Sequence, residues 1–319
     1  MGNFVCGQYV ILNVDDSTTD SNANKNEGKD VPVSSGDVGN TLPSDNDAGG
    51  DTQPTAFDIS RQIQRQMLRI QGEFMTEEGR KVDYDSIKKS DVFSEYLKTA
   101  ELLRRCSLAS LDDDENERKA FFINVYNALN IHGVISAGGL PDSLTGKLGY
   151  WKRTGYLIDN MRFTLDDIEH GILRGNSRAS SQIFGSAYFP ESDPRLRFRL
   201  VKDQRIHFAL NCGARSCPAI RVYDGRNLER GLNSATNSFC QSEVKVVEKD
   251  AGIHVELSHL FKWFRGDFVP KSGKGDPVLR WIVENVLEVE SCDLIRRELD
   301  EGKAVEITYS PYDWTCNAH

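Results

Sequence analysis

The residues best suited to chemistry lie close together, where His207 is followed by Cys212 and Cys217. A cysteine acts as a nucleophile when it is a thiolate, and a neighbouring imidazolium or helix N-terminus lowers the thiol pKa. Residues 206–211 are predicted to form a strand, which would place His207 and Cys212 on opposite faces. Gly213 permits a bend that would bring the two together. The segment therefore predicts either a thiol nucleophile with a histidine base or a buried structural cysteine beside a histidine.

The same three side chains raise two alternatives to a nucleophile. His207, Cys212 and Cys217 are separated by four residues each time. Zinc sites favour closer cysteine pairs and need a fourth ligand, for which His170 is a candidate. A disulfide between Cys212 and Cys217 is unfavoured in a reducing compartment. We therefore expect no bound metal and no cofactor.

A long helix is predicted over residues 114–137, and it carries another histidine. The helix is apolar along most of its length, which predicts that it is largely buried. His132 continues the stripe of Val125 and Leu129 at i, i+4 and i+7. A buried histidine must find a hydrogen-bond partner. His132 is therefore either a candidate base or a satisfied residue of the core.

A shorter helix, predicted over residues 165–174 after a hairpin, carries a charged edge. Asp166, His170 and Arg174 are four residues apart, and Glu169 lies nearer the apolar side. Such an edge is either solvated or directs an acid and an orienting group into a cleft. Glu169 and His170 therefore join the candidate catalytic residues.

The composition is that of a globular protein with an acidic end. Hydrophobic residues make up 39% and charged residues 27% of the 319 residues, and the net charge is −9. Residues 1–55 hold nine acidic residues and two lysines, so the rest of the chain is nearly neutral. A nearly neutral chain predicts no nucleic-acid surface. Seven scattered cysteines, together with the lack of a signal sequence or a long apolar run, predict a cytoplasmic protein with reduced thiols.

The first residues offer one route to a membrane. Removal of Met1 would expose Gly2, as N-myristoylation requires, but position 6 is Cys6 and not the favoured Ser or Thr. Cys6 is instead a candidate for palmitoylation, and two lipid chains anchor a protein stably where one does not. The sequence leaves open an unmodified cytoplasmic protein and one attached peripherally to a membrane through its acylated N-terminus.

Helical and strand patterns alternate irregularly, which favours an α+β fold over a doubly wound sheet. A disordered acidic tail over residues 1–55 lacks the apolar surface to offset its ordering entropy. One helix-rich globular domain is expected over residues 56–319, with a small mixed or antiparallel sheet built partly from hairpins. Its aromatic end, residues 309–314, is expected to pack back onto the core. The patterns predict helices over residues 57–74, 86–106, 114–137, 165–174, 226–240, 259–264, 278–286 and 292–299, and strands over 156–158, 162–164, 206–211, 244–247, 253–255 and 304–309.

Four motifs, in this order, resemble a known family. They are Asn-Val-Tyr-Asn-Ala-Leu at 124–129, Asp-Asp-Ile-Glu-His-Gly-Ile-Leu-Arg at 166–174, His-Phe-Ala-Leu-Asn-Cys-Gly-Ala-Arg-Ser-Cys-Pro at 207–218, and Tyr-x-Pro-Tyr-Asp-Trp at 309–314. Together they resemble the domain-of-unknown-function 547 family, with a signature region of about 114–240 and a C-terminal extension to residue 319. The resemblance implies a shared fold and no settled reaction.

Two functions remain open. The one that the acidic tail and the lipidation candidates favour is a non-catalytic binding or scaffold module for an unknown protein or small-molecule partner. The alternative is a thiol-dependent enzyme of papain or transglutaminase type that acts on an amide or thioester. Cys212 would then be the nucleophile and one of the three histidines above the base. In such enzymes the cysteine begins the long helix, where this chain has Asn124. A cleft that joins Cys212 to a histidine would favour the enzyme, whereas separate and fully buried motif residues would favour the module.

Overall fold

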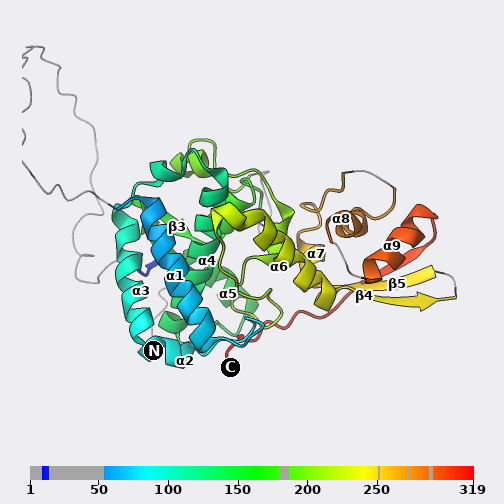
Figure 1. Ribbon diagram of the computed structural model, residues 1–319, viewed down its shortest axis with the longest axis horizontal. Coiled ribbons are helices and arrows are strands. Elements are labelled where there is room, and N and C mark those ends of the chain that lie inside the picture. The colour runs from blue at the N-terminus through cyan, green and yellow to red at the C-terminus, as the bar shows by residue number, and fades with distance from the viewer. Residues whose placement is uncertain (1–8, 14–53, 180–186, 251, 272–273, 287–289) are drawn as a thin grey trace, which may run out of the picture.

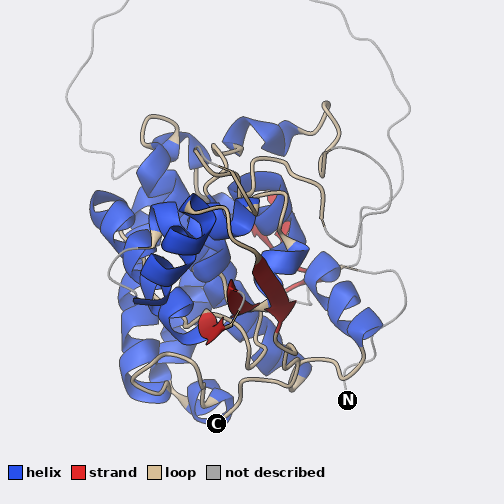
Figure 2. Ribbon diagram, turned by 90° about the vertical axis from the view of Figure 1, so that its right-hand side faces the viewer, coloured by secondary structure: helices blue, strands red, loops and turns tan. Residues whose placement is uncertain are grey.

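The computed structural model describes residues 9–13, 54–179, 187–250, 252–271, 274–286 and 290–319. Most of the predicted disordered tail lies outside these ranges, and so do both lipidation candidates, Gly2 and Cys6. The described chain combines helices with two small mixed sheets of three strands each (Figure 2). The predicted helix-rich α+β class is confirmed, with two small sheets where one was expected.

Helix α4, Glu115–Ala137, runs through the centre of the larger part of the molecule (Figure 1). The Asp114 side chain caps it by accepting a hydrogen bond from the N–H of Glu117. Gly138 ends it at φ 71°, a left-handed conformation that glycine adopts without strain. Nearly every residue of α4 is buried, as its apolar run predicts.

Three helices near the N-terminus pack with α4 around a first hydrophobic core. Helix α1, Ala56–Phe74, begins with a capping box between Thr55 and Asp58. The single helix predicted over residues 86–106 is wrong, because the chain forms two helices there. Ser90 ends the first, and its hydroxyl accepts a hydrogen bond from the N–H of Phe93 to begin the second. The two are α2, Tyr84–Lys89, and α3, Asp91–Leu102.

The predicted hairpin near residue 160 is present. Strands β2, Thr154–Ile158, and β3, Met161–Thr164, pair in antiparallel fashion. Asp159 and Asn160 form the turn, both with positive φ, as a tight hairpin requires. Strand β1, Val10–Ile11, adds to β2 in parallel. Shorter helical segments of this part are α5, Leu144–Arg153; η2, Leu103–Arg105; η3, Leu108–Leu111; η4, Asp167–Leu173; η5, Pro194–Phe198; and η7, Gly225–Asn227.

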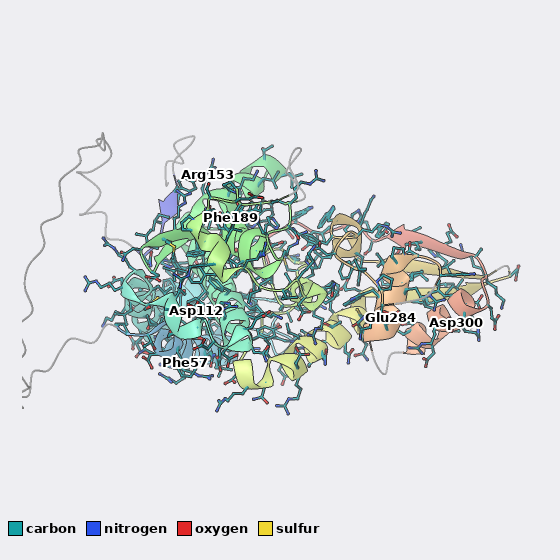
Figure 3. All side chains as sticks on the ribbon, turned by 90° about the horizontal axis from the view of Figure 1, so that it is seen from above. Phe57, Asp112, Arg153, Phe189, Glu284 and Asp300 are labelled. Atoms are coloured by element: carbon teal, nitrogen blue, oxygen red, sulfur yellow. The ribbon has the colours of Figure 1, made fainter. Side chains whose placement is uncertain are left out.

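A second, smaller lobe has its own hydrophobic core. Figure 3 shows it at the far end from Phe57 and Asp112, with Glu284 and Asp300 marking its position. Its sheet has the order β4-β5-β6, and one strand pair of this sheet is the second predicted hairpin. The elements are α6, Leu228–Glu243; β4, Lys245–Lys249; β5, Gly252–Leu257; α7, His259–Trp263; α8, Pro277–Asn285; α9, Glu290–Asp300; and β6, Val305–Tyr309.

The strand predicted over residues 206–211 is wrong. A 3-10 helix, η6, occupies Gln204–Phe208, and the carboxylate of Asp203 caps its start. Ile206 packs in the first core, whereas Phe208 packs in the second. The apolar residues Ile206, Phe208 and Leu210 alternate along the chain as in a strand, but they pack against the two cores in turn.

The C-terminal segment returns from β6 to the larger lobe (Figure 1). Cys316 pairs with Ala214 in an isolated bridge, and the N–H of Asn317 donates to the carbonyl of Gly213 at 2.8 Å. The Asn317 side chain accepts a hydrogen bond from the hydroxyl of Tyr84 and is fully buried. The chain end therefore holds the turn that follows η6 against the larger lobe.

Candidate functional site

A cavity of about 360 Å³ is lined by residues of both hydrophobic cores. Its walls come from α4, α5, the helix after β3, η6 and the turn that follows it, α7 and the C-terminal segment. A volume of this size suits a small molecule or the end of one long side chain. Four of the five predicted catalytic candidates line it: Glu169, His170, His207 and Cys212.

Amide side chains hold the turn that carries the two thiols of the cavity. Asn127 of α4 accepts a hydrogen bond from the N–H of Asn211 and donates one to the carbonyl of Ala209, both at 2.9 Å. Asn211 then donates to the carbonyl of Pro218 at 2.7 Å and accepts from the N–H of Gly213 at 2.8 Å. Gly213 has φ 87°, which favours glycine. Gly213 therefore bends the chain, and His207 and Cys212 line one cavity without a hydrogen bond between them.

The two thiols of this turn form a hydrogen-bonded pair. The Sγ atoms of Cys212 and Cys217 lie 2.8 Å apart. The N–H of Cys212 donates to the Sγ of Cys217 at 3.2 Å, and the hydroxyl of Tyr312 lies 3.3 Å from the same sulfur. Burial raises the pKa of Cys217, but hydrogen bonds from the Cys212 thiol and the Tyr312 hydroxyl outweigh it, so this pKa lies below its ordinary value. The Cys212 pKa lies well above its ordinary value, because the hydrogen bond to Cys217 and burial both favour the thiol. Cys217 is therefore the more acidic thiol of the pair.

His207 is held by the carboxylate of Asp267. Its Nε2 lies 2.9 Å from the Oδ2 of Asp267, and the ring stacks on Phe264 with centroids 4.1 Å apart. Arg174 and Lys202 also donate to this carboxylate, at 2.7 and 2.8 Å. Burial lowers the pKa of His207 more than Asp267 raises it, so the ring is neutral at neutral pH. The Asp267 carboxylate accepts a hydrogen bond from Nε2, so Nε2 carries the ring proton and Nδ1 is the basic nitrogen. Nδ1 has no hydrogen-bond partner among the described residues.

Glu169 and His170 lie on a widened helical turn. Residues Asp167–Leu173 form a π-helix, a geometry that is frequent at functional sites. The hydroxyl of Tyr126 donates to Glu169 at 3.2 Å, and the guanidinium of Arg174 donates to Nδ1 of His170 at 2.8 Å. Burial raises the pKa of Glu169 and lowers the pKa of His170 well below its ordinary value. The pair therefore offers an acid of weakened strength beside an uncharged ring.

The structure does not bring His132 to the cavity. Its Nδ1 lies 2.9 Å from the hydroxyl of Tyr156, which in turn lies 2.7 Å from the hydroxyl of Tyr96. The ring also contacts Phe93 edge-on. Burial lowers the pKa of His132 to about 4. His132 is therefore a neutral core residue with a satisfied hydrogen bond.

Several residues of the site were not selected from the sequence. Asp267 lies in the loop after α7, 60 residues from His207, and no local spacing marks it. Tyr312 lies in the aromatic end that the sequence predicts to pack onto the core, and its hydroxyl also contacts the Sγ of Cys217. Other aromatic residues of the lining that the sequence does not single out as site residues are Trp151, Trp263, Phe264 and Trp314.

Three observations on the described ranges bear on the metal, membrane and disulfide alternatives. No group of three or more His, Cys, Asp or Glu side chains within those ranges is arranged to hold a metal ion. No helix in that part of the chain is both long enough and apolar enough to cross a membrane. The described cysteines, Cys212 and Cys217 included, are free thiols.

Comparison with known proteins gives one family. Residues 109–240 match the model of the family described as "Protein of unknown function, DUF547". No curated protein and no solved structure gives a significant match. The matched region begins in η3 and ends in α6, so it contains both thiols and all the histidines of the cavity, while Asp267 and Tyr312 follow it. Residues 109–240 of this chain are therefore a domain of the DUF547 family.

Proposed function

We propose that the chain is a thiol-dependent acyl-transfer enzyme, with Cys217 as the nucleophile and His207, oriented by Asp267, as the base. The observation that carries the proposal is one cavity lined by both a hydrogen-bonded thiol pair and a carboxylate-held histidine. The sequence alone favours a non-catalytic binding or scaffold module. A cleft shared by a thiol and a histidine is the arrangement that favours the enzyme instead.

The hydrogen bonds assign different roles to Cys217 and His207. Cys217 accepts hydrogen bonds from the Cys212 thiol, the Cys212 N–H and the Tyr312 hydroxyl, and these donors favour its thiolate. No histidine nitrogen hydrogen bonds to either sulfur within the described residues. Nδ1 of His207 is therefore available to take a proton from the group that accepts the acyl chain.

The proposed reaction has two halves, acylation of Cys217 and transfer of the acyl group to an acceptor. In the first, the Cys217 thiolate attacks the carbonyl carbon of a thioester or amide, a C–S bond forms, and the bond to the leaving group breaks. The leaving group takes its proton from the carboxyl of Glu169, whose pKa burial raises. In the second, an acceptor attacks the acyl-enzyme, the C–S bond breaks, and Cys217 leaves as a thiolate. Nδ1 of His207 takes the acceptor's proton, and exchange with water restores Glu169 and His207.

The test is the acyl-enzyme itself. The full chain is mixed with p-nitrophenyl butyrate, and nitrophenolate release is followed by absorbance while peptide mass spectrometry locates the butyryl group. A burst of nitrophenolate with the adduct on Cys217 supports the proposal. The Cys217→Ser variant should lose both signals.

Cys316→Ser provides the matched control. Cys316 is a partly exposed free thiol that does not line the cavity, so this variant should keep the burst and the adduct. Acylation of Cys316 in place of the cavity thiols, or no acylation of the folded chain, contradicts the proposal and returns the binding module as the better account.

A further inference from the structure

The cavity has acidic groups that its own side chains do not balance. Asp166 and Glu169 both line it, together with the acidic thiol Cys217. No Lys or Arg side chain belongs to the lining, and the two lining histidines are neutral. Each of these groups becomes an anion when it loses its proton, so the lining favours a positive ligand over a negative one.

Asp166 is the less satisfied of the two carboxyl groups. Asp166 is 6% exposed. Nε2 of His170 lies 4.0 Å from its Oδ1, which is too long for a hydrogen bond. No described side chain or backbone N–H donates to its carboxylate. Glu169 differs, because the hydroxyl of Tyr126 donates to it. Because Asp166 lines the cavity, a ligand bound there can supply the donor that its carboxyl lacks.

Aromatic rings form much of the remaining lining. Trp263 of α7 stacks on Trp314 with centroids 5.1 Å apart, and Tyr312 lies 4.5 Å from Trp314. Trp151 of α5 extends the series, 5.8 Å from Trp314. The faces of Trp and Tyr rings attract cations, most strongly where water is excluded. Rings of this kind beside an unpaired carboxyl make a lining suited to an organic ammonium group.

We infer that the cavity binds the ammonium group of an organic amine, with Asp166 as its counter-ion and the rings of Trp263 and Trp314 as its cation–π partners. The inference deepens the proposed function and rests on it in one respect, because it makes the amine the acceptor of the acyl group. The product would then be an amide. Binding of the amine needs no catalysis and is testable by itself.

The proton steps follow from the same contacts. The ammonium group donates a hydrogen bond to the Asp166 carboxylate and then transfers that proton, which leaves a neutral amine. The amine nitrogen attacks the carbonyl carbon of the acyl-Cys217 thioester, an N–C bond forms, and the C–S bond breaks. Nδ1 of His207 takes the second proton of the amine. Water then carries the protons away from Asp166 and His207.

An ammonium group in this cavity has two sources. One is a free alkylamine, and the other is a lysine side chain presented by a polypeptide. Both place a primary ammonium at the end of a short apolar stem, and the cavity volume of about 360 Å³ admits either. Pentylamine and Nα-acetyl-lysine methylamide share that stem and separate the two sources.

The experiment measures binding to the full chain by tryptophan fluorescence. Three of the four tryptophans, Trp151, Trp263 and Trp314, line the cavity and report its occupancy. Pentylamine, pentan-1-ol and pentanoate have similar shapes and carry a positive, zero and negative charge. We expect pentylamine to bind tightest and pentanoate weakest at pH 8. Tighter binding of the lysine derivative than of pentylamine identifies a polypeptide source, and the reverse identifies a free amine.

Asp166→Asn should weaken pentylamine binding by about tenfold or more, since hydrogen bonds to charged groups are worth that much, and leave pentan-1-ol unchanged. Asp313→Asn is the matched control, because Asp313 is exposed beside Tyr312 and Trp314 without lining the cavity. Equal binding of pentan-1-ol and pentylamine, or an unchanged Asp166→Asn variant, overturns the inference. Pentylamine binding without an acyl adduct on Cys217 supports the amine site and contradicts the proposed enzyme. An acyl adduct on Cys217 without pentylamine binding supports the enzyme and contradicts the amine site.

Discussion

Nε2 of His207 lies 2.9 Å from Oδ2 of Asp267, although 60 residues separate the two in the chain. His207 belongs to the DUF547 region, whereas Asp267 follows it in the smaller lobe. Arg174 reaches the same carboxylate from the larger lobe at 2.7 Å. One carboxylate thus ties the two lobes together beside the cavity, and it also fixes the tautomer of the histidine that lines it.

Replacing Asp267 by Asn should lower both stability and acyl transfer. Arg174 would be left buried without its charge partner, and loss of one partner of a buried pair costs about 3 kcal/mol or more. An amide does not hold Nδ1 of His207 in its basic form, so the rate should fall about a hundredfold or more. Urea unfolding measures the loss of stability, and the steady rate of nitrophenolate release after the burst measures the loss of acyl transfer.

Lys202→Gln is the control for this variant. Lys202 donates to the same carboxylate, but its side chain is 34% exposed, so its loss should cost less than about 1 kcal/mol. A Lys202→Gln variant as unstable as Asp267→Asn would show that the carboxylate serves the salt bridges and not the histidine.

The two thiols of the cavity should differ in acidity. We expect Cys217 to react with iodoacetamide at lower pH than Cys212, because hydrogen bonds stabilise its thiolate and oppose that of Cys212. Alkylation rates against pH, read for each cysteine by peptide mass spectrometry, give the two midpoints. A lower midpoint for Cys212 would exchange the assigned roles.

Tyr312→Phe should raise the alkylation midpoint of Cys217. The change removes one hydroxyl that hydrogen bonds to the sulfur, and a hydrogen bond to a charged group corresponds to roughly one pKa unit. Tyr309→Phe is the matched control, since Tyr309 lies on β6 and does not line the cavity. Equal midpoints for both variants would mean that Tyr312 does not stabilise the thiolate.

Asp166→Asn should make the protein more stable at alkaline pH. Burial raises the pKa of Asp166 to about 8, so the unfolded chain loses this proton at lower pH than the folded one. The contribution of Asp166 to the free energy of unfolding is therefore complete below its ordinary pKa of about 4 and is lost as pH rises toward 8. About four pKa units correspond to roughly 5 kcal/mol.

The measurement is urea unfolding of Asp166→Asn and the wild type at pH 5 and pH 8. The gain should be several kcal/mol at pH 8 and much smaller at pH 5. The other charged groups near Asp166 remain in both proteins, namely Glu169 and Asp167, which raise its pKa, and Lys152, which lowers it. The same gain at both pH values would mean that Asp166 is ionised in the folded chain without penalty.

The parts of the fold that sequence could predict are those set by neighbours in the chain. Helix α4 follows from its apolar run between Asp114 and Gly138, and the first hairpin follows from the Asp159–Asn160 turn. The segment after Asp203 misled, because its alternation comes from contact with two cores. Alternation identifies a strand only when one core lies on one side of it.

The candidate site could be predicted only in part, for a related reason. Glu169, His170, His207 and Cys212 stand out as chemical residue types within short motifs, and all four line the cavity. The partners that decide their roles are distant in sequence, as Asp267 is from His207. The hydrogen bonds that make Cys217 and not Cys212 the more acidic thiol depend on a turn geometry that no spacing encodes.

The last prediction concerns His132, the candidate that the structure places in the core. Burial lowers its pKa to about 4, whereas in the unfolded chain its pKa is near 6.5. Between these pH values the unfolded chain binds a proton at His132 and the folded chain does not. Its contribution to stability is therefore complete above pH 6.5 and lost as pH falls toward 4, by about 3 kcal/mol.

His132→Gln keeps a hydrogen-bonding group for Tyr156 but does not titrate, so its stability should fall less between pH 7 and pH 4 than that of the wild type. Urea unfolding across this range tests the difference, and acyl transfer at neutral pH should be unchanged because His132 does not line the cavity. A large loss of acyl transfer in a stably folded His132→Gln chain would instead give this histidine a role in the chemistry.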